Sequence, residues 1–395
     1  MDSVEELLER GVANIIPNIN VLLGKLRAGK KLNVYLGIDP TSTKLHLGHA
    51  VVLRKLNAFA QKGHIVTFLI GDFTALIGDT SDKNSERPSL TIKEIQENFK
   101  TYKKQAEKIL DFSKVKIEYN SKWLKKLTFE EIIKLNQHFS ANDLLSRELI
   151  KKRISEGKRV GLQEFSYPVM QGYDSYMLDT DLQIGGTDQT FNMQAGRTLI
   201  KDLKNKESFV LTTPILEGTD GRKMSKSWGN AIWLDDKPND MFAKVMAIND
   251  LQIMTYFRDT TNLPLKKIDE YDHRLKKGES KNPINIKKEL AFQIVKELHS
   301  EKSGEEAKKE FEKTVQNKEL PDTISLFPVG NFNQTIFEIV SDWAQMSNSE
   351  LKRLIQQKGV EVDGEKISMD KSNEKVTKGM IIKIGHKRVV KISSK

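Results

Sequence analysis

The sequence predicts a doubly wound α/β domain with a parallel sheet, followed by an α-helical domain and a small basic module. Three observations lead to this fold class. Short apolar runs alternate with helical patterns through residues 1–232, helical patterns alone fill residues 233–328, and basic side chains exceed acidic ones in residues 331–395. A chain of 395 residues is also long enough for two or three domains.

Three strands are expected in the first domain, at residues 33–38, 65–71 and 115–119, because each run is rich in β-branched or bulky apolar residues. Between the last two runs, apolar residues recur every three or four positions from Ile92 to Ile109, which is the pattern of an amphipathic helix. Alternating strands and helices predict a parallel sheet covered on both faces, with a ligand site at the C-terminal ends of the strands.

The second domain is predicted from residues 233–328, where helical segments are separated by polar loops and the strand–helix alternation stops. Pro321, Phe327, Pro328 and Gly330 then predict a linker to the third module.

Composition narrows the classes of function. The absence of cysteine excludes a disulfide scaffold, a thiolate nucleophile and a cysteine-held metal site. No run approaches the roughly 18 apolar residues of a membrane span, and the acidic N-terminus lacks the layout of a signal peptide, so we expect a cytoplasmic protein. The net charge of +10 favours a polyanionic partner, above all at residues 371–395, where Glu374 is the single acid among eight basic side chains.

The first candidate for chemistry follows the predicted strand at residues 33–38. His46 and His49 share one face of the first turn of a helix, where free N–H groups favour anions. Gly48 between them leaves the backbone accessible, and the Thr41 hydroxyl is near in sequence, so these residues could line a phosphate chain. For this motif alone, a helix start with incidental histidines is the alternative.

Two further segments could complete a nucleotide site. Lys223 and Lys226 lie in a polar loop that could neutralise a polyphosphate in a transition state, although a solvated basic loop is the alternative. The two glycines at residues 185–186 permit close approach of the backbone, and Asp188 could hold ribose hydroxyls. A simple turn is the alternative for that segment.

In this order, these motifs resemble those of the class I aminoacyl-tRNA synthetases. The His-Leu-Gly-His run at residues 46–49 matches the HIGH element of the family, and the Lys-Met-Ser-Lys-Ser run at residues 223–227 matches its KMSKS loop. Residues 35–41, 167–174 and 185–189 resemble the tyrosyl-tRNA synthetase family, and Thr-Phe-Asn after the last of these resembles its shorter bacterial subgroup. The resemblance covers nearly the whole chain.

The resemblance implies a Rossmann-like catalytic domain and an activity. Such an enzyme activates L-tyrosine with ATP to tyrosyl-adenylate, releases pyrophosphate and transfers the tyrosyl group to the 3′-terminal ribose of its tRNA. ATP with Mg²⁺ is then a substrate, and we expect no metal or organic cofactor held by the protein itself. Because the carboxylate of tyrosine is already ionised, the reaction needs positioning and positive charge rather than a cysteine or serine nucleophile.

The resemblance also implies roles for individual residues. Tyr35 and Asp174 would bind the phenolic hydroxyl group of tyrosine, whereas Asp79, Tyr167 and Gln171 would hold its α-ammonium group. The ATP-binding positions would be Gly37, Asp39, Gly48, Gly186, Asp188, Gln189 and Lys226. The phosphates and the leaving pyrophosphate would face Thr41, His46, His49, Lys83, Arg87, Lys223 and Lys226.

One loop departs from the family pattern. The family commonly has Gly-Asp-Pro-[Thr/Ser]-Gly-Lys where this chain reads Gly-Asp-Thr-Ser-Asp-Lys at residues 78–83. The loss of the proline and glycine should change the rigidity of the loop, and Asp82 adds a negative charge beside Lys83. On charge alone, Lys83 and Arg87 read as exposed surface residues.

The third module resembles the small α+β RNA-binding module of ribosomal protein S-four, at residues 348–355 and 359–364. Ser349 is the expected N-cap of its helix. The apolar residues of that helix would face the module core, leaving Lys352 and Arg353 to bind RNA phosphates, with a solvated helix face as the alternative.

The family works as a homodimer, and residues 120–165 are the predicted interface. Two other functions fit part of the pattern. A tryptophanyl-tRNA synthetase shares the fold and both ATP motifs, but Asp39, the Tyr35 and Asp174 pair and the appended module argue against it. A non-catalytic RNA-binding protein derived from a synthetase would have no need for the paired histidines and the loop lysines.

Overall fold

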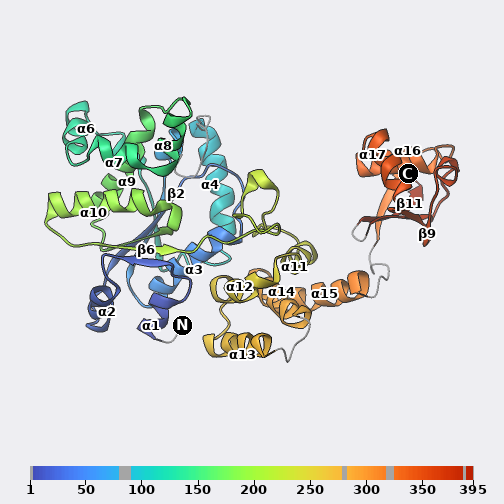
Figure 1. The fold of residues 1–395 in the computed structure, drawn as a ribbon, viewed down its shortest axis with the longest axis horizontal. Coiled ribbons are helices and arrows are strands. Elements are labelled where there is room, and N and C mark those ends of the chain that lie inside the picture. The colour runs from blue at the N-terminus through green and yellow to red at the C-terminus, as the bar shows by residue number, and fades with distance from the viewer. Residues whose placement is uncertain (1–2, 80–89, 278–282, 317–323, 386–387, 395) are drawn as a thin grey trace. The chain divides into compact units, whose positions relative to one another are not determined.

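The computed structural model describes residues 3–79, 90–277, 283–316, 324–385 and 388–394. Its contacts divide the chain into two units, Met1–Gly304 and Glu305–Lys395, drawn in Figure 1. The predicted fold class, a doubly wound α/β domain with further helices, is confirmed. The three-domain division stays a prediction, because the grouping by contacts places residues 233–304 in the first unit.

A sheet forms the centre of the first unit. Its described strands lie in the order β1-β6-β5-β2-β3-β4 (Figure 1). Neighbouring strands from β2 to β6 are parallel, whereas β1 pairs antiparallel with β6 at one edge. The predicted strands are confirmed, with β3 ending one residue earlier than expected. The bounds are β1 (Asn14–Ile16), β2 (Asn33–Ile38), β3 (Ile65–Ile70), β4 (Val115–Tyr119), β5 (Leu182–Gly186) and β6 (Phe209–Thr213).

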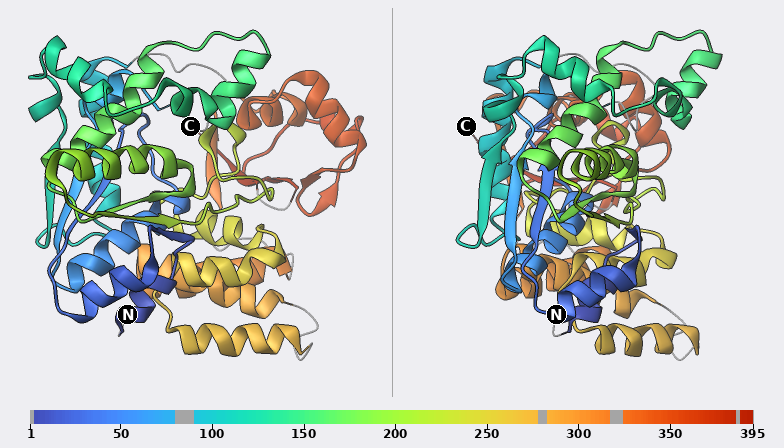
Figure 2. Two further views of the ribbon diagram at one scale, coloured as in Figure 1. Left: turned by 60° about the vertical axis from the view of Figure 1, so that its left-hand side comes forward. Right: turned by 90° about the vertical axis from the view of Figure 1, so that its left-hand side faces the viewer.

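Helices cover both faces of this sheet, as Figure 2 shows. α3 (Leu47–Gln61) joins β2 to β3, and α10 (Thr190–Lys204) joins β5 to β6. These two connections step in opposite directions from the middle of the sheet, so right-handed crossovers place their helices on opposite faces. The strand order therefore reverses between β2 and β5, and such a switch point is where α/β sheets bind ligands.

The predicted amphipathic helix is α4 (Ile92–Ala106), which buries Ile95, Tyr102 and Ala106. Short helices then fill the connection between β4 and β5 before α9 (Gln163–Met177), which packs along α10. In this connection, Leu135 packs with Val169 of α9 and Leu199 of α10. The short helices are α5 (Ser121–Leu124), α6 (Phe129–Asn136), α7 (Ala141–Ser146) and α8 (Glu148–Ser155).

The first unit is completed by helices at both ends of its sequence. α1 (Val4–Glu9) and α2 (Ile19–Arg27) come before β2, and a helical region follows β6. In that region α14 packs against α11 and α12, with Phe242, Tyr256 and Leu290 fully buried. The helices are α11 (Pro238–Met246), α12 (Ile253–Thr260), α13 (Leu265–Lys276), α14 (Ile284–Leu298) and α15 (Glu301–Phe311), the last of which continues into the second unit.

The second unit is a small α+β module. Its sheet has the order β7-β11-β10-β8-β9, and α16 (Ile336–Ala344) and α17 (Asn348–Gln356) contribute to a core that includes Ile339, Leu351 and Ile382. The strands are β7 (Ser325–Val329), β8 (Val360–Val362), β9 (Glu365–Lys366), β10 (Ile381–Ile384) and β11 (Arg388–Ser394).

Two sequence expectations are wrong in this unit. Phe327 and Pro328, expected in a linker, lie in β7, which pairs in parallel with β11. The N-cap of α17 is Ser347 rather than Ser349, and its hydroxyl accepts a hydrogen bond from the backbone N–H of Glu350 at 3.3 Å. In the whole of the described part of the chain, no helix combines the length and apolar character needed to cross a membrane.

Candidate functional site

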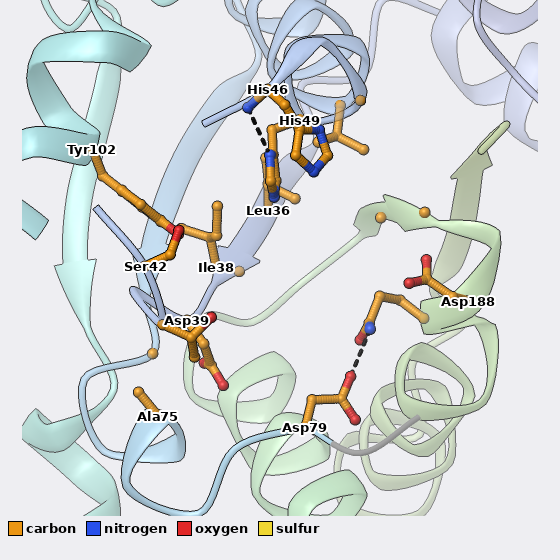
Figure 3. A pocket seen from close by; sticks show the side chains of 18 of the residues that line it. Leu36, Ile38, Asp39, Ser42, His46, His49, Ala75, Asp79, Tyr102 and Asp188 are labelled. Atoms are coloured by element: carbon orange, nitrogen blue, oxygen red, sulfur yellow. Dashed lines mark hydrogen bonds between the residues drawn. The ribbon is translucent and has the colours of Figure 1, made fainter. Parts of the chain in front are cut away.

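A cavity of about 690 Å³ lies at the switch point of the sheet (Figure 3). Its walls come from the ends of β2 and β5, the start of α3, α9 and the loop after β6. Most of the predicted site residues line this cavity: Tyr35, Gly37, Asp39, Thr41, His46, Gly48, His49, Asp79, Tyr167, Gln171, Asp174, Gly186, Asp188, Gln189, Lys223 and Lys226.

Four predicted site residues are not among them. Lys83 and Arg87 lie outside the described residues. Lys352 and Arg353 belong to the second unit, where both are exposed on α17. Within the described part of the chain, no three His, Cys, Asp or Glu side chains gather into a group that could hold a metal ion.

The two histidines stand at the start of α3, as predicted. His46 is the N-cap, its backbone N–H donates to Nδ1 of His49 at 3.1 Å, and the ring centroids are 3.9 Å apart (Figure 3). A side chain at Gly48 would meet the His46 ring at 3.0 Å, so a glycine between the histidines permits this close packing. The pair therefore presents two imidazoles at a helix N-terminus.

Both imidazoles are neutral near pH 7. Burial lowers the pKa of His46 to about 2, and the neighbouring His49 and Lys223 contribute to this shift. Burial, with a contribution from Lys223, lowers the pKa of His49 to about 4. Since Nδ1 of His49 accepts the backbone hydrogen bond, the proton of the neutral ring lies on Nε2. His49 can thus donate one hydrogen bond to an anion without carrying charge itself.

Asp39 organises the floor of the cavity. Its Oδ1 accepts from the Thr74 hydroxyl at 2.7 Å, and its Oδ2 accepts from the Tyr167 hydroxyl at 2.9 Å. Burial, reinforced by Asp39 and Asp79, raises the pKa of Tyr167 well above its ordinary value, so this phenol remains a donor. The Asp39 carboxylate therefore fixes two side chains from different elements.

Asp174 is a buried carboxyl group at the cavity wall. Trp123 donates its indole N–H to Oδ1 at 2.7 Å, and Asn120 donates its amide to Oδ2 at 3.2 Å. Burial raises the pKa of Asp174 to about 8, although these two hydrogen bonds act in the opposite direction. Such a group can bind the hydroxyl of a ligand in a water-poor environment.

Tyr35 lies on β2, directly opposite Gln183 of β5 in the sheet register. Its hydroxyl is 2.7 Å from Oγ of Ser175 and donates to Oε1 of Gln183 at 3.2 Å. Tyr35 also belongs to a buried apolar cluster with Leu69 and Trp123. The wall near Tyr35 and Asp174 thus combines apolar surface with two polar groups, a combination that suits a phenol ring.

Acidic groups on the other side of the cavity are paired. Gln189 donates to Oδ2 of Asp79 at 2.7 Å (Figure 3), and Lys223 lies 3.2 Å from Oδ2 of Asp188. Gly186, the last residue of β5, lines the cavity close to Asp188 in the sequence. The ion pair therefore connects the loop after β6 to the short turn at Thr187–Gln189, which follows β5 and carries the predicted ribose-binding carboxylate.

Several residues of the site have no motif that reveals them in the sequence. Thr74, Asn120, Trp123, Ser175 and Gln183 each bind a predicted site residue, yet all lie outside the recognisable runs. Trp233 also lines the cavity, and its ring centroid is 5.9 Å from that of His46. These residues act through contacts that are distant in sequence, so spacing does not point to them.

The chain is similar to known proteins over almost its full length. A family model described as tRNA synthetases class I (W and Y) matches residues 27–316. A tyrosine–tRNA ligase of Thermotoga maritima is 40% identical over 389 residues, which covers 98% of this chain and 96% of the relative. A tyrosine–tRNA ligase of Bdellovibrio bacteriovorus is 43% identical over 404 residues and covers 99% of each chain.

Solved structures share the fold. A tyrosyl-tRNA synthetase from Archaeoglobus fulgidus, complexed with L-tyrosine, has a TM-score of 0.61 and 22% identity, covering 77% of this chain and 99% of that chain. A tryptophanyl-tRNA synthetase from Plasmodium falciparum has a TM-score of 0.56 and 17% identity, covering 73% and 80%. At these identities the likeness shows the fold alone. The family model and the sequence relatives carry the assignment: this chain belongs to the class I tRNA synthetases of the tryptophan and tyrosine family, with the tyrosine–tRNA ligases.

Proposed function

We propose that this chain attaches L-tyrosine to its tRNA in two steps. The first step forms tyrosyl-adenylate from tyrosine and ATP and releases pyrophosphate, and the second transfers the tyrosyl group to the 3′-terminal ribose of the tRNA. One observation carries the proposal: a single cavity at the switch point joins the histidine pair and the loop lysines with a buried hydroxyl-binding carboxyl group. The relatives named tyrosine–tRNA ligase support the same activity.

The proposed chemistry needs few reactive side chains. An oxygen of the tyrosine carboxylate attacks the α-phosphorus of ATP, and a new P–O bond forms. The bond between the α-phosphorus and the oxygen that bridges to the β-phosphorus breaks, and pyrophosphate leaves. Because the nucleophile is already ionised and the leaving group is pyrophosphate, the protein contributes alignment and positive charge. Mg²⁺ enters with ATP as part of the nucleotide substrate.

The tyrosine end of the proposed site is the wall formed by Tyr35 and Asp174. A phenolic hydroxyl placed here would add a hydrogen bond to Asp174 beside those from Trp123 and Asn120. A phenyl ring would cover this buried carboxyl group without replacing that bond, at a cost of about 1–3 kcal/mol. Asp79, Tyr167 and Gln171 are the proposed partners of the α-ammonium group, since they line the same cavity and include a carboxylate.

The nucleotide end of the proposed site is the start of α3 together with the loop after β6. His46, His49 and Thr41 would donate to the phosphates, because both imidazoles are neutral donors at a helix N-terminus. Lys223 and Lys226 would carry the charge that develops on pyrophosphate, with Lys83 and Arg87 as further proposed partners. Asp188 would hold the ribose, near the glycine backbone at Gly186; Gly37, Asp39, Gly48 and Gln189 complete the proposed ATP-binding set.

The test is ATP–pyrophosphate exchange with each of the twenty amino acids. We expect exchange with tyrosine alone. Exchange with tryptophan would replace the proposed specificity with that of the other family branch. No exchange with any amino acid would refute the proposed catalysis and leave an RNA-binding role.

We also propose that the chain works as a homodimer through residues 120–165. Six large apolar side chains of this segment are exposed on the single chain, and Phe129 and Leu162 are 78% and 83% exposed. A monomer rarely leaves such groups uncovered in one region. The six are Phe129, Ile132, Ile133, Leu145, Ile154 and Leu162. Sedimentation over a range of concentrations should give a dimer that Phe129→Asp dissociates, and a wild-type monomer throughout would refute the interface.

The proposed tRNA contacts of the second unit are Lys352 and Arg353, which lie exposed on α17. The proposed place of action is the cytoplasm, as the composition indicates. Fractionation of cells with an antibody against the chain would test that location, and recovery in a membrane or exported fraction would contradict it.

A further inference from the structure

One buried side chain closes the cationic loop. Residues 218–230 form this loop, and Asn230 at its end is 2% exposed. Nδ2 of Asn230 donates to Oδ1 of Asp220 at 2.6 Å and also lies 3.1 Å from the carbonyl oxygen of Lys223 and 3.3 Å from that of Arg222. Its Oδ1 accepts from the backbone N–H of Ser225 at 2.9 Å. A single carboxamide therefore holds the loop on both sides of Lys223.

The same loop also has a backbone hydrogen bond to Leu216, which precedes it. The backbone N–H of Met224 donates to the carbonyl oxygen of Leu216 at 2.9 Å, and the Met224 side chain is 2% exposed. Residue 224 is thus anchored on the body of the unit while Asn230 fixes residues 222, 223 and 225. Between these anchors, Lys223 reaches Asp188 at 3.2 Å and Lys226 lines the cavity.

The packing around Asn230 leaves room for no larger neighbour. A Cβ atom at Gly218 would lie 2.5 Å from Cγ and from the backbone oxygen of Asn230, so the first residue of the loop must be glycine if Asn230 is to stay in place. An aspartate at position 230 would keep the acceptor for Ser225 but would lose both N–H donors. It would also place a second carboxylate beside Asp220.

We propose that Asn230 is a positioning residue for adenylate formation, which acts through the lysines of the loop. It is not among the residues that line the cavity; it holds the backbone of the loop that carries Lys223 and Lys226, which do line it. The inference rests on the proposed function, and it adds a residue whose loss should affect the phosphate step while leaving tyrosine binding intact.

The first experiment compares Asn230→Ala with the wild-type full-length chain in tyrosine-dependent ATP–pyrophosphate exchange. Misplacement of charged groups by about 1 Å can cost about 10²-fold in rate, and we expect a loss of this order in kcat, with the KM for tyrosine unchanged. Asn20→Ala, which removes an exposed asparagine side chain on α2, is the matched control and should behave as wild type. Wild-type kcat in Asn230→Ala would overturn the inference.

A double-mutant cycle separates positioning from general damage. If Asn230 acts through the lysines, Asn230→Ala should lower the rate much less in a Lys223→Ala or Lys226→Ala background than in the wild-type chain. The same fold-loss in every background would overturn the inference. Asp220→Ala removes only one of the partners of Asn230 and should give a smaller loss in the same parameter, which keeps the test valid if Asn230→Ala unfolds. If the wild-type chain shows no tyrosine-dependent exchange, the proposed function fails instead.

Discussion

Asp174 shows how strongly one position can depend on its surroundings. Its carboxyl group is 3% exposed and has two described donors, on Trp123 and Asn120. Burial raises its pKa to about 8, so a large part of the population is protonated near neutral pH. A residue that is ordinarily a fixed negative charge is here a group that titrates near physiological pH.

This shift has a consequence for stability against pH. A carboxyl group with a pKa near 4 in the unfolded chain and near 8 in the fold binds its proton more tightly when folded. The stability that this protonation adds is complete below about pH 4 and is lost as the pH rises through about 8. As the pH rises from about 4 to about 8, the free energy of unfolding of the wild type should therefore decrease relative to that of Asp174→Asn.

Urea unfolding of the wild type and of Asp174→Asn, each at about pH 5 and about pH 9, measures this difference. Asp240→Asn, at an exposed position of α11, is the matched control. If wild type and Asp174→Asn lose stability in parallel between the two pH values, the shifted titration is not that of Asp174.

Among the elements, α3 has two tasks. Its N-terminus presents the histidine pair to the cavity, and its middle binds other helices of the first unit. Arg54 pairs with Glu297 of α14 at 2.8 Å, with both side chains largely buried, and Lys55 donates to the carbonyl oxygen of Leu7 at 2.7 Å. The orientation of the first turn is thus fixed by ion pairs and hydrogen bonds two turns further along the helix.

Arg54→Ala should destabilise the first unit, because it leaves the buried Glu297 carboxylate without its cationic partner. Breaking a buried pair from one side costs about 3–5 kcal/mol in the free energy of unfolding. Urea unfolding measures this loss. Lys276→Ala breaks the surface pair with Asp272 and should cost about 0.5 kcal/mol or less. Equal effects of the two substitutions would show that the Arg54 pair contributes no more than a surface pair.

The strands and the helix with a strong local pattern are predicted correctly, whereas β7, which depends on a distant partner strand, is not. The pattern that predicts the strand at residues 33–38 and the helix that follows it lies within the residues of those elements themselves. Phe327, Pro328 and Gly330 predict a linker, whereas the structure has β7 at Ser325–Val329. This strand lies at the edge of its sheet, where a proline is tolerated. The cap of α17 is a different case, because a local signal exists: Ser347 stands three residues before Glu350, which is the spacing of a capping box, yet Ser349 is the expected cap.

The same distinction applies to the site. The histidine pair and the loop lysines are contiguous motifs, so their placement at one cavity could be predicted. Asn120 and Trp123 come to Asp174 from about fifty residues earlier in the chain, and Gln183 comes to Tyr35 through sheet register. Only the folded sheet brings these pairs together, and single-sequence patterns do not encode which strand lies beside which.

For the whole molecule, we expect substitutions in the second unit to affect tRNA charging without affecting amino-acid activation. Reversal of charge at Lys352 and Arg353 by glutamate should weaken tRNA charging and reduce the dependence of log affinity on log salt by about two, one for each lost phosphate contact. Amino-acid activation should be unchanged, because these residues lie in a different unit from the cavity. The measurements are aminoacylation over a salt series and ATP–pyrophosphate exchange.

A charge-matched control distinguishes contact from net charge. Lys30→Glu with Lys31→Glu makes the same change in total charge at two exposed residues of the first unit. An equal loss of tRNA charging in this control would mean that the overall charge of the protein, rather than α17, governs tRNA binding.

The walls of the cavity come from residues as far apart as Tyr35 and Trp233. During synthesis on a ribosome, the nascent chain therefore has more than half its length before the last wall exists. The β2 strand and the histidine pair emerge early, and the cavity stays incomplete until β5, β6 and the loop lysines have been synthesised. A chain that stops short of residue 223 retains Tyr35 and Asp174, the proposed tyrosine-binding residues, but lacks the loop lysines, so we expect such a fragment to form no adenylate.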